Sequence, residues 1–303
     1  MRRMVRRWTI SVAALMLAAC GSYPKPEIAE TAASLGRVQT VFRDYYTTLN
    51  TYGRDVYVRS QVFRGQPISP EALDQKGSVY PDAAIQARLS ALKLVGRYVE
   101  LLNTYGGGTQ AKDLGAASGA VSQAAFKLSA DLNAALGAGD AGLAKYQGPV
   151  SNLIGLVAQW GTDAYLRKSF KEQVHNTTPR ILEIMALLKA DGDNVLAPKH
   201  LVGTSLEFSS IAGYYNARAA TLSFQERSQV APMLIEAATA RDAANHLSFS
   251  PVIDAADKAV VVLDKRTRGE ATPEEAAVAL EEFTDRVDAL RELVEQLKQA
   301  QKE

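Results

Sequence analysis

The sequence predicts an all-α protein built as an elongated bundle of long antiparallel helices. Apolar residues recur at alternating steps of three and four, a spacing that places them on one face of a helix. Short clusters rich in glycine and proline separate these periodic segments, as turns between helices do. The chain lacks the many short alternating segments of a strand-rich domain. Long periodic segments joined by such turns pack most simply as a helical bundle.

The first long helix is expected to begin at Ile28 and to run to about Phe63. At 1.5 Å per residue it would be about 54 Å long. After it comes the densest cluster of helix breakers in the chain, Gly65–Pro81, with one helical turn expected at Pro70–Gln75 behind Ser69 as N-cap. The apolar seam of the long helix has a heptad period and consists of Leu35, Val38, Phe42, Tyr45, Leu49, Tyr52 and Val56.

The middle of the chain carries three more helical patterns. Two of them cover residues 82–105 and 111–136, and the third runs from Leu143 to a break at Thr178. Gly137–Gly142 has the spacing G-x-G-x-x-G, but a helix rather than a strand precedes it, so it indicates a turn between helices and not a dinucleotide site. Pro179 either begins a new helix behind Thr178 or kinks a continuous one.

The second half of the chain is also expected to be helical. One helix ends at Asp191-Gly192. The helical part forms either one elongated domain or two, and in the second case the loop Asp191–Pro198 is the best place for the boundary, with sub-bundles 28–190 and 198–303. Two more helical segments follow over residues 201–222 and 224–265, where prolines at 232 and 251 mark kinks or joins.

The last helix has the clearest start signal in the protein. Thr272 is expected to be its N-cap, Pro273 its first residue and Glu275 the reciprocal partner of a capping box. Its seam repeats at four, three, four and three residues through Phe283, Val287, Leu290, Val294 and Leu297.

The N-terminus has the three parts of an export signal. Four arginines lie within the first seven residues, and twelve mostly apolar residues follow from Trp8 to Ala19, too few to span a membrane. The stretch Leu17-Ala18-Ala19-Cys20 resembles the lipobox of bacterial lipoproteins. This resemblance covers residues 1–22 and implies cleavage between Ala19 and Cys20, a diacylglycerol on the Cys20 sulfur and an acyl chain such as palmitate on its amino group.

The same resemblance implies an address. Bacterial lipoproteins kept in the inner membrane of Gram-negative cells often carry aspartate after the cysteine, and this chain has Gly21. We therefore expect an outer-membrane lipoprotein that faces the periplasm, with signal peptide 1–19, lipidated cysteine and tether 20–27, and a helical domain 28–303. Two or more lipid chains hold a protein firmly on a membrane, whereas one holds it only marginally.

Charge and cysteine content exclude several classes of protein. The whole chain has 34 basic and 33 acidic residues, and removal of the signal peptide leaves 30 basic and 33 acidic ones, a formal charge of −3. This balance argues against a nucleic-acid-binding protein, which needs a concentrated basic face. Cys20 is the single cysteine, so the domain has no internal disulfide, thiol nucleophile or cysteine-based zinc site.

No motif in the chain predicts a cofactor, a metal site or catalytic residues. The three histidines lie at 175, 200 and 246, without the spacing of metal ligands on one helix. The stretch Asp191-Gly192-Asp193-Asn194 resembles the start of a calcium loop, but the twelfth position, which needs a glutamate, is Val202. The sequence also contains neither a G-x-S-x-G motif nor a phosphate-binding P-loop.

These observations predict a non-catalytic lipoprotein that binds or scaffolds a protein partner in the periplasm. An immunity protein against an envelope toxin is one form of this function. An alternative is a hydrolase of cell wall or lipid whose site is assembled only in the fold, and a third is a carrier of an apolar ligand. If the loop Gly65–Pro81 contacts the partner, Ile68 and Tyr80 are the apolar residues expected to do so.

Overall fold

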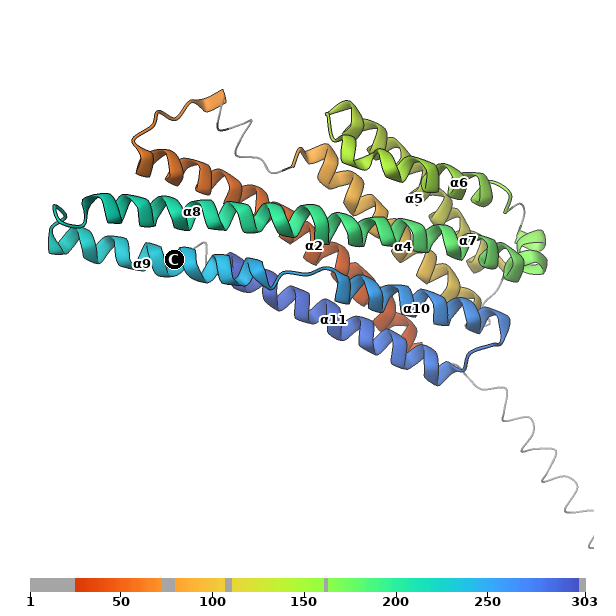
Figure 1. Cartoon of the computed structure of the whole chain (residues 1–303). Coiled ribbons are helices and arrows are strands. Elements are labelled where there is room, and N and C mark those ends of the chain that lie inside the picture. The colour runs from red at the N-terminus through yellow and green to blue at the C-terminus, as the bar shows by residue number, and fades with distance from the viewer. Residues whose placement is uncertain (1–24, 72, 74–79, 107–110, 161–162, 300–303) are drawn as a thin grey trace, which may run out of the picture.

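The computed structural model describes residues 25–71, 73, 80–106, 111–160 and 163–299 (Figure 1). Within these ranges the chain is almost entirely helical and contains no strand, which confirms the predicted all-α bundle. None of the helices there is apolar enough over a sufficient length to cross a membrane. The signal peptide, the lipobox and Cys20 lie outside the described residues.

The first half of the bundle consists of long helices followed by two short ones. Their bounds are α2 Lys25–Arg64, α4 Asp82–Gly106, α5 Ala111–Gly137, the 3₁₀-helix η1 Ala141–Tyr146 and α6 Gln147–Val157. The first three agree with the predicted helices to within a few residues, and residues 70, 71 and 73 are helical where one turn was expected. The Gly137–Gly142 segment forms the predicted turn, in which Gly139 has φ +93°, a conformation that favours glycine.

The second half begins with one very long helical segment. It runs without interruption from Asp163 to Arg218 as α7 Asp163–Asp191, the π-helical η2 Gly192–Leu196 and α8 Ala197–Arg218. The remaining helices are α9 Phe224–Asn245, α10 Ser250–Arg268 and α11 Pro273–Gln299. Pro179 lies inside α7, so the continuous alternative is the observed one.

The predicted loop at Asp191–Pro198 is therefore wrong, because this segment is helical. The acidic side chains that made it resemble a loop have long-range partners: Asp191 bonds Arg88 of α4, and Asp193 bonds Ser250 at the start of α10. One hydrophobic core extends from Val38 of α2 to Val294 of α11 and includes residues from both sides of the expected boundary.

Helix α2 organises the bundle because its seam is buried. All the predicted seam residues whose exposure is described lie in the core, from Val38 to Val56. Along its second half α2 runs parallel to α8: Tyr45 lies beside His200, Tyr52 beside Glu207 and Phe63 beside Tyr214. The α8–α9 hairpin thus extends toward the C-terminal end of α2, far from the end that begins at Lys25 (Figure 1).

Candidate functional site

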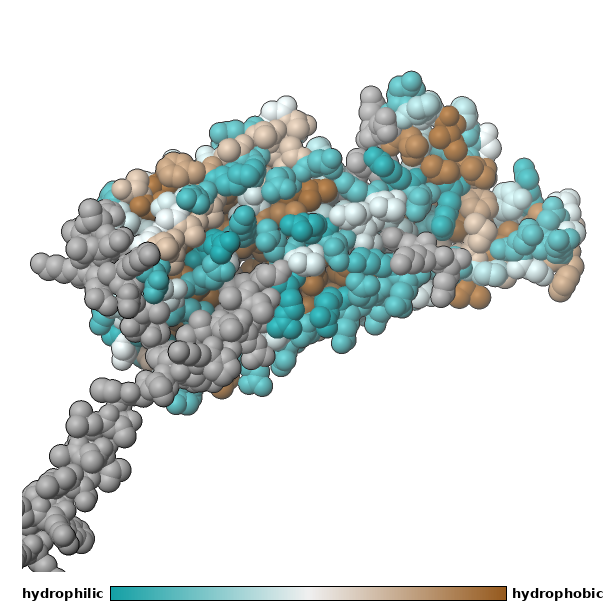
Figure 2. All heavy atoms as spheres, turned by 180° about the vertical axis from the view of Figure 1, so that it is seen from behind, coloured by the Kyte–Doolittle hydropathy of each residue, from teal (hydrophilic) through white to brown (hydrophobic). Residues whose placement is uncertain are grey.

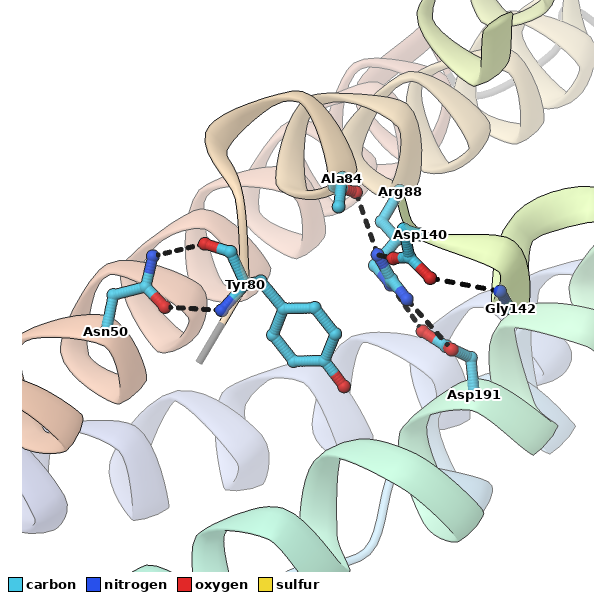
Figure 3. Close-up of polar contacts among 7 residues, drawn as sticks. All are labelled: Asn50, Tyr80, Ala84, Arg88, Asp140, Gly142 and Asp191. Carbon is cyan, nitrogen blue, oxygen red and sulfur yellow. Dashed lines mark hydrogen bonds and ion pairs between the residues drawn. The ribbon is translucent and has the colours of Figure 1, made fainter. Parts of the chain in front are cut away.

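The strongest concentration of buried charge lies around Arg88, whose side chain is 1 % exposed. Its Nε and Nη2 donate to the two carboxylate oxygens of Asp191 at 2.5 and 3.1 Å. Its Nη1 donates to a carboxylate oxygen of Asp140 and to the carbonyl oxygen of Ala84, both at 3.0 Å (Figure 3). We call Arg88, Asp140, Asp191 and the adjacent Tyr80 the arginine cluster.

Local backbone geometry brings both acids to the guanidinium. Asp140 follows the turn at Gly139 and accepts a hydrogen bond from the Gly142 backbone N–H, as the N-cap of η1. Asp191 is the last residue before the π-helical turn η2, a type of irregularity that often occurs at functional sites. Gly192 has no room for a side chain there, because an added Cβ would lie 2.7 Å from the Phe249 ring.

Tyr80 closes the arginine cluster on its other side. The Asn50 side chain accepts a hydrogen bond from the Tyr80 backbone N–H and donates one to its carbonyl oxygen, both at 3.0 Å (Figure 3). This pair fixes the end of the loop that precedes α4. The Tyr80 ring lies 4.5 Å from the Arg88 guanidinium and 4.3 Å from the Lys199 ammonium, distances that favour cation–π attraction.

Burial and neighbouring charges shift the pKa values of Arg88 and Tyr80 upward. Burial would lower the pKa of Arg88, but the hydrogen bonds and negative charge of Asp191 outweigh it and raise that pKa. Burial, reinforced by the charge of Asp191, raises the pKa of Tyr80. Four of the five N–H donors of Arg88 are engaged by protein acceptors, so the group ties α4, the α5–η1 turn and the end of α7 together.

A second polar row follows the interface between α2 and α8. His200 is 1 % exposed and lies against the rings of Tyr45 and Tyr52. The Tyr52 hydroxyl donates to Glu207 at 2.5 Å, and Glu207, itself buried, forms an ion pair with Arg59 at 2.8 Å. The row fixes α8 against α2 and thereby sets the direction of the α8–α9 hairpin.

His200 makes the stability of the fold depend on pH. Burial lowers its pKa in the folded protein from 6.5 to about 4. Between these two pH values the unfolded chain therefore binds more protons than the folded protein. The contribution of neutral His200 to the free energy of unfolding is fully present above pH 6.5 and decreases as the pH falls toward 4.

We expect His200→Gln to flatten this dependence, because an amide does not titrate. Between pH 7 and pH 4.5 the wild type should lose about 2 kcal/mol more stability than the variant. Urea unfolding followed by circular dichroism at both pH values measures the difference. Parallel losses in the two proteins would contradict the assignment.

The two residues expected at a partner interface, Ile68 and Tyr80, differ in their exposure to solvent. Ile68 is 41 % exposed, so its role as a contact stays a prediction. Tyr80 is 3 % exposed, and its role as a surface contact is therefore wrong: Asn50 holds its backbone, and its ring packs against Arg88 and Tyr46. Cys20 and Ala19 lie outside the described residues.

Sequence reasoning missed Arg88, Asp140 and Asp191 as members of one cluster. A signal for Arg88 was present, since it lies beside Ala84 and Ala91 at helical spacing on a face of α4 that is otherwise apolar. In the described part of the chain no three histidine, cysteine or acidic side chains converge as a metal site would require.

Exposed hydrophobic residues gather in another region, which we call the distal lobe. It comprises the last turns of α2 with the segment after it (residues 56–71) together with α8 and α9 (residues 197–245). Figure 2 shows hydrophobic residues around the end of α2 and the segment that follows it. Among the described residues, eight large hydrophobics are clearly exposed, and six of these belong to the distal lobe: Val62, Ile68, Val202, Leu206, Phe224 and Ile235.

The tip of the distal lobe is fixed by a capping box that the sequence analysis overlooked. Ser223 accepts from the Glu226 backbone N–H, and the Glu226 carboxylate accepts from the Ser223 backbone N–H. Bonds from the Ser223 side chain and backbone lower the pKa of Glu226. The next residue, Phe224, is 81 % exposed at the start of α9. Below the tip, Ile211 and Val230 form a small core of their own with Ala237.

Comparison with protein families, with curated proteins and with solved structures finds no match to this chain.

Proposed function

We propose that the protein is a non-catalytic lipoprotein that binds a protein partner in the periplasm through its distal lobe. The anchor in this proposal is Cys20, on the outer membrane of a Gram-negative bacterium. The observation that supports partner binding is the location of six of the eight clearly exposed large hydrophobics in one lobe. Exposed hydrophobics that gather in one region are typical of interaction surfaces, whereas single scattered ones need no explanation.

The geometry of α2 relates this lobe to the proposed anchor. Helix α2 has 40 residues, which corresponds to about 60 Å along its axis. It begins five residues after Cys20 in the sequence and ends in the distal lobe. A lipid at Cys20 would thus hold one end of the rod, and the α8–α9 hairpin would lie at the other end, away from the lipid surface.

The energetics favour a partner with an apolar surface of its own. Full burial of one large aliphatic or aromatic side chain contributes about 1.5–3 kcal/mol. Two such residues, Phe224 and Ile235, expose 81 % and 67 % of their surface and would gain most from being covered. Residues of this kind, near the centre of an interface, carry most of the binding energy in protein complexes.

Photo-crosslinking in intact cells tests this proposal. A photoreactive phenylalanine analogue placed at Phe224, Leu206 or Ile235 should give one discrete crosslinked product. The same analogue at Phe126 or Val278 is the matched control, because these residues are 55 % and 60 % exposed but lie outside the distal lobe. We expect Phe224→Asp to weaken the product formed from Leu206 by at least tenfold, since a charge in an apolar interface costs several kcal/mol.

The pattern of products decides the outcome. Equal crosslinking from the distal and the control positions would overturn the distal lobe as the binding surface. Purification of the discrete product identifies the partner. A toxin as the partner would support the immunity function, and a structural envelope protein would support the scaffold function.

A further inference from the structure

A groove between α2 and α4 is the largest of four cavities compared among the described residues. Its volume is about 560 Å³, within the range of small-ligand sites, and the other described cavities hold 10 to 20 Å³. Residues of both helices line it. Helix α2 contributes Arg43, Thr47, Asn50, Thr51, Arg54 and Asp55, and helix α4 contributes Asp82, Ile85, Gln86 and Leu89. We call it the α2–α4 groove.

The groove is electrically asymmetric. Helices α2 and α4 are antiparallel, and the bonds between Asn50 and the Tyr80 backbone fix their register. Arg43 therefore lies at the end near Gln86 and Leu89, and no acidic residue lines that end. The opposite end holds Asp55 with Arg54, and Asp82, in the first turn of α4, lies on that side of Gln86 and Leu89, so these three groups together carry a formal charge of −1.

These charges have no counter-ions within the described part of the chain. Neither Arg43 nor Asp55 nor Asp82 forms an ion pair there, although the neighbouring Asp44 pairs with Lys298 at 2.8 Å. The groove thus presents Arg43 alone at one end, whereas toward the other end two carboxylates outnumber the single cation, Arg54. A ligand with a carboxylate and an ammonium group at opposite ends would complement both.

The interior of the groove fits a peptide backbone. Thr47 and Thr51 donate their hydroxyl hydrogens to main-chain oxygens of α2, so each hydroxyl retains acceptor capacity for a ligand N–H. The Gln86 side chain on the facing wall offers a carbonyl oxygen and one N–H donor, since its amide nitrogen already donates to the Ser90 hydroxyl. Ile85 and Leu89 add an apolar strip against which small side chains can pack.

The spacing of the charges sets the length of the ligand. Arg43 and Asp55 are twelve residues apart on α2, which corresponds to about 18 Å along the axis. An extended chain covers about 3.3–3.6 Å per residue, so about five residues span this distance. We propose that the α2–α4 groove binds a short extended peptide with free termini, its carboxylate at Arg43 and its ammonium group at Asp55 and Asp82.

This site is distinct from the distal lobe and does not depend on the proposed partner binding. The probe for its test is pentaalanine, whose charges lie on its termini. Titration of the protein with pentaalanine, followed by nuclear magnetic resonance, should show saturable shifts at Asn50 and Gln86. N-acetyl-pentaalanine and pentaalanine amide, each lacking one charge, should bind about threefold to fivefold more weakly. Trialanine, too short to reach both ends, should lose a similar amount.

Substitutions assign each end of the peptide. Arg43→Gln should abolish the preference for the free carboxylate, so that the acid and the amide bind equally, while the preference for the free amine persists. Asp55→Asn with Asp82→Asn should give the reverse pattern. Arg227→Gln is the matched control, because this exposed arginine of α9 lies outside the groove, and it should change neither preference.

The proposal is overturned if pentaalanine causes no saturable shift up to 20 millimolar, a concentration chosen to detect weak binding. It is also overturned if Arg227→Gln alters the preferences as much as Arg43→Gln does. Unchanged circular dichroism spectra of the variants would show that any loss arises in the groove and not from unfolding.

Discussion

Asp191→Asn is expected to lower the free energy of unfolding by about 3–5 kcal/mol, because it removes one partner of a fully buried ion pair. Asparagine keeps the size of the side chain, so the loss comes from the charge and not from a cavity. Arg88 would then retain Asp140 as its acidic partner, at 3.0 Å and with 15 % of the Asp140 side chain exposed. Urea unfolding of purified protein, followed by circular dichroism, measures the change.

Asp254→Asn is the matched control for this substitution. It removes a carboxylate that pairs with Lys189, also on α7, but both side chains of that pair are at least one-third exposed. Exposed pairs contribute about 0–1 kcal/mol, so the control should lose little. Equal losses in the two variants would contradict a special role for the arginine cluster.

A double substitution tests whether the loss of stability comes from leaving one charge of the Arg88–Asp191 pair buried without its partner. Arg88→Met alone leaves Asp191 and Asp140 without their cation, so it should destabilise as strongly as Asp191→Asn. Arg88→Met combined with Asp191→Leu removes both charges of the fully buried pair, and it should recover part of the loss because only Asp140, whose side chain is 15 % exposed, then lacks its cation. A double variant as unstable as the sum of the single ones would show that the two residues act independently.

Hydrophobic periodicity was sufficient to predict the fold class and the bounds of α2, α4, α5 and α11, but it missed the break between α6 and α7 and marked the one between α9 and α10 only as a kink or join at Pro251. The α2 seam from Val38 to Val56 and the capping box at Thr272 are local signals, and local signals are what a single sequence carries. The capping box at Ser223 has the same S-x-x-E form and was within reach of the same reasoning.

The errors arose where distant partners decide the structure. Asp191-Gly192-Asp193-Asn194 has the composition of a turn, yet Arg88 and Ser250, far away in the sequence, engage its acids while the helix continues. Tyr80 ends a segment rich in prolines and glycines, which suggests exposure, but Asn50 and Arg88 hold it inside. Pairs separated by 30 to 103 residues leave no periodic trace in the sequence.

The arginine cluster and the distal lobe are connected through one helical segment. Asp191 lies at the end of α7, and the same segment continues through η2 into α8, which carries Val202 and Leu206 of the distal lobe. Loss of the Arg88–Asp191 pair would free the junction from which α8 extends. We therefore expect Asp191→Asn to reduce crosslinking from Leu206 under conditions in which the variant is still folded.

Cys20→Ser is expected to release the protein completely from the membrane fraction. The thioether to diacylglycerol requires the cysteine sulfur, so a serine receives no lipid, and the described helices include no segment that could span the bilayer in its place. Each buried methylene of a lipid chain contributes about 0.8 kcal/mol, so the loss of two or more chains removes far more binding energy than protein contacts with lipid could restore. Membrane sedimentation of cells that express the wild type or the variant measures the distribution.

Ser22→Ala is the matched control, because it changes a hydroxyl two residues away and leaves the thiol intact. Mass spectrometry of the wild-type N-terminal peptide should detect Cys20 as its first residue, with the mass of the lipid added. An unmodified thiol on the exported protein would refute the lipid anchor at Cys20. The separation of the distal lobe from the N-terminal end of α2 would then have to be explained without a membrane. Release of Cys20→Ser together with unchanged crosslinking from Phe224 would instead keep the partner and show that it is recognised without the membrane.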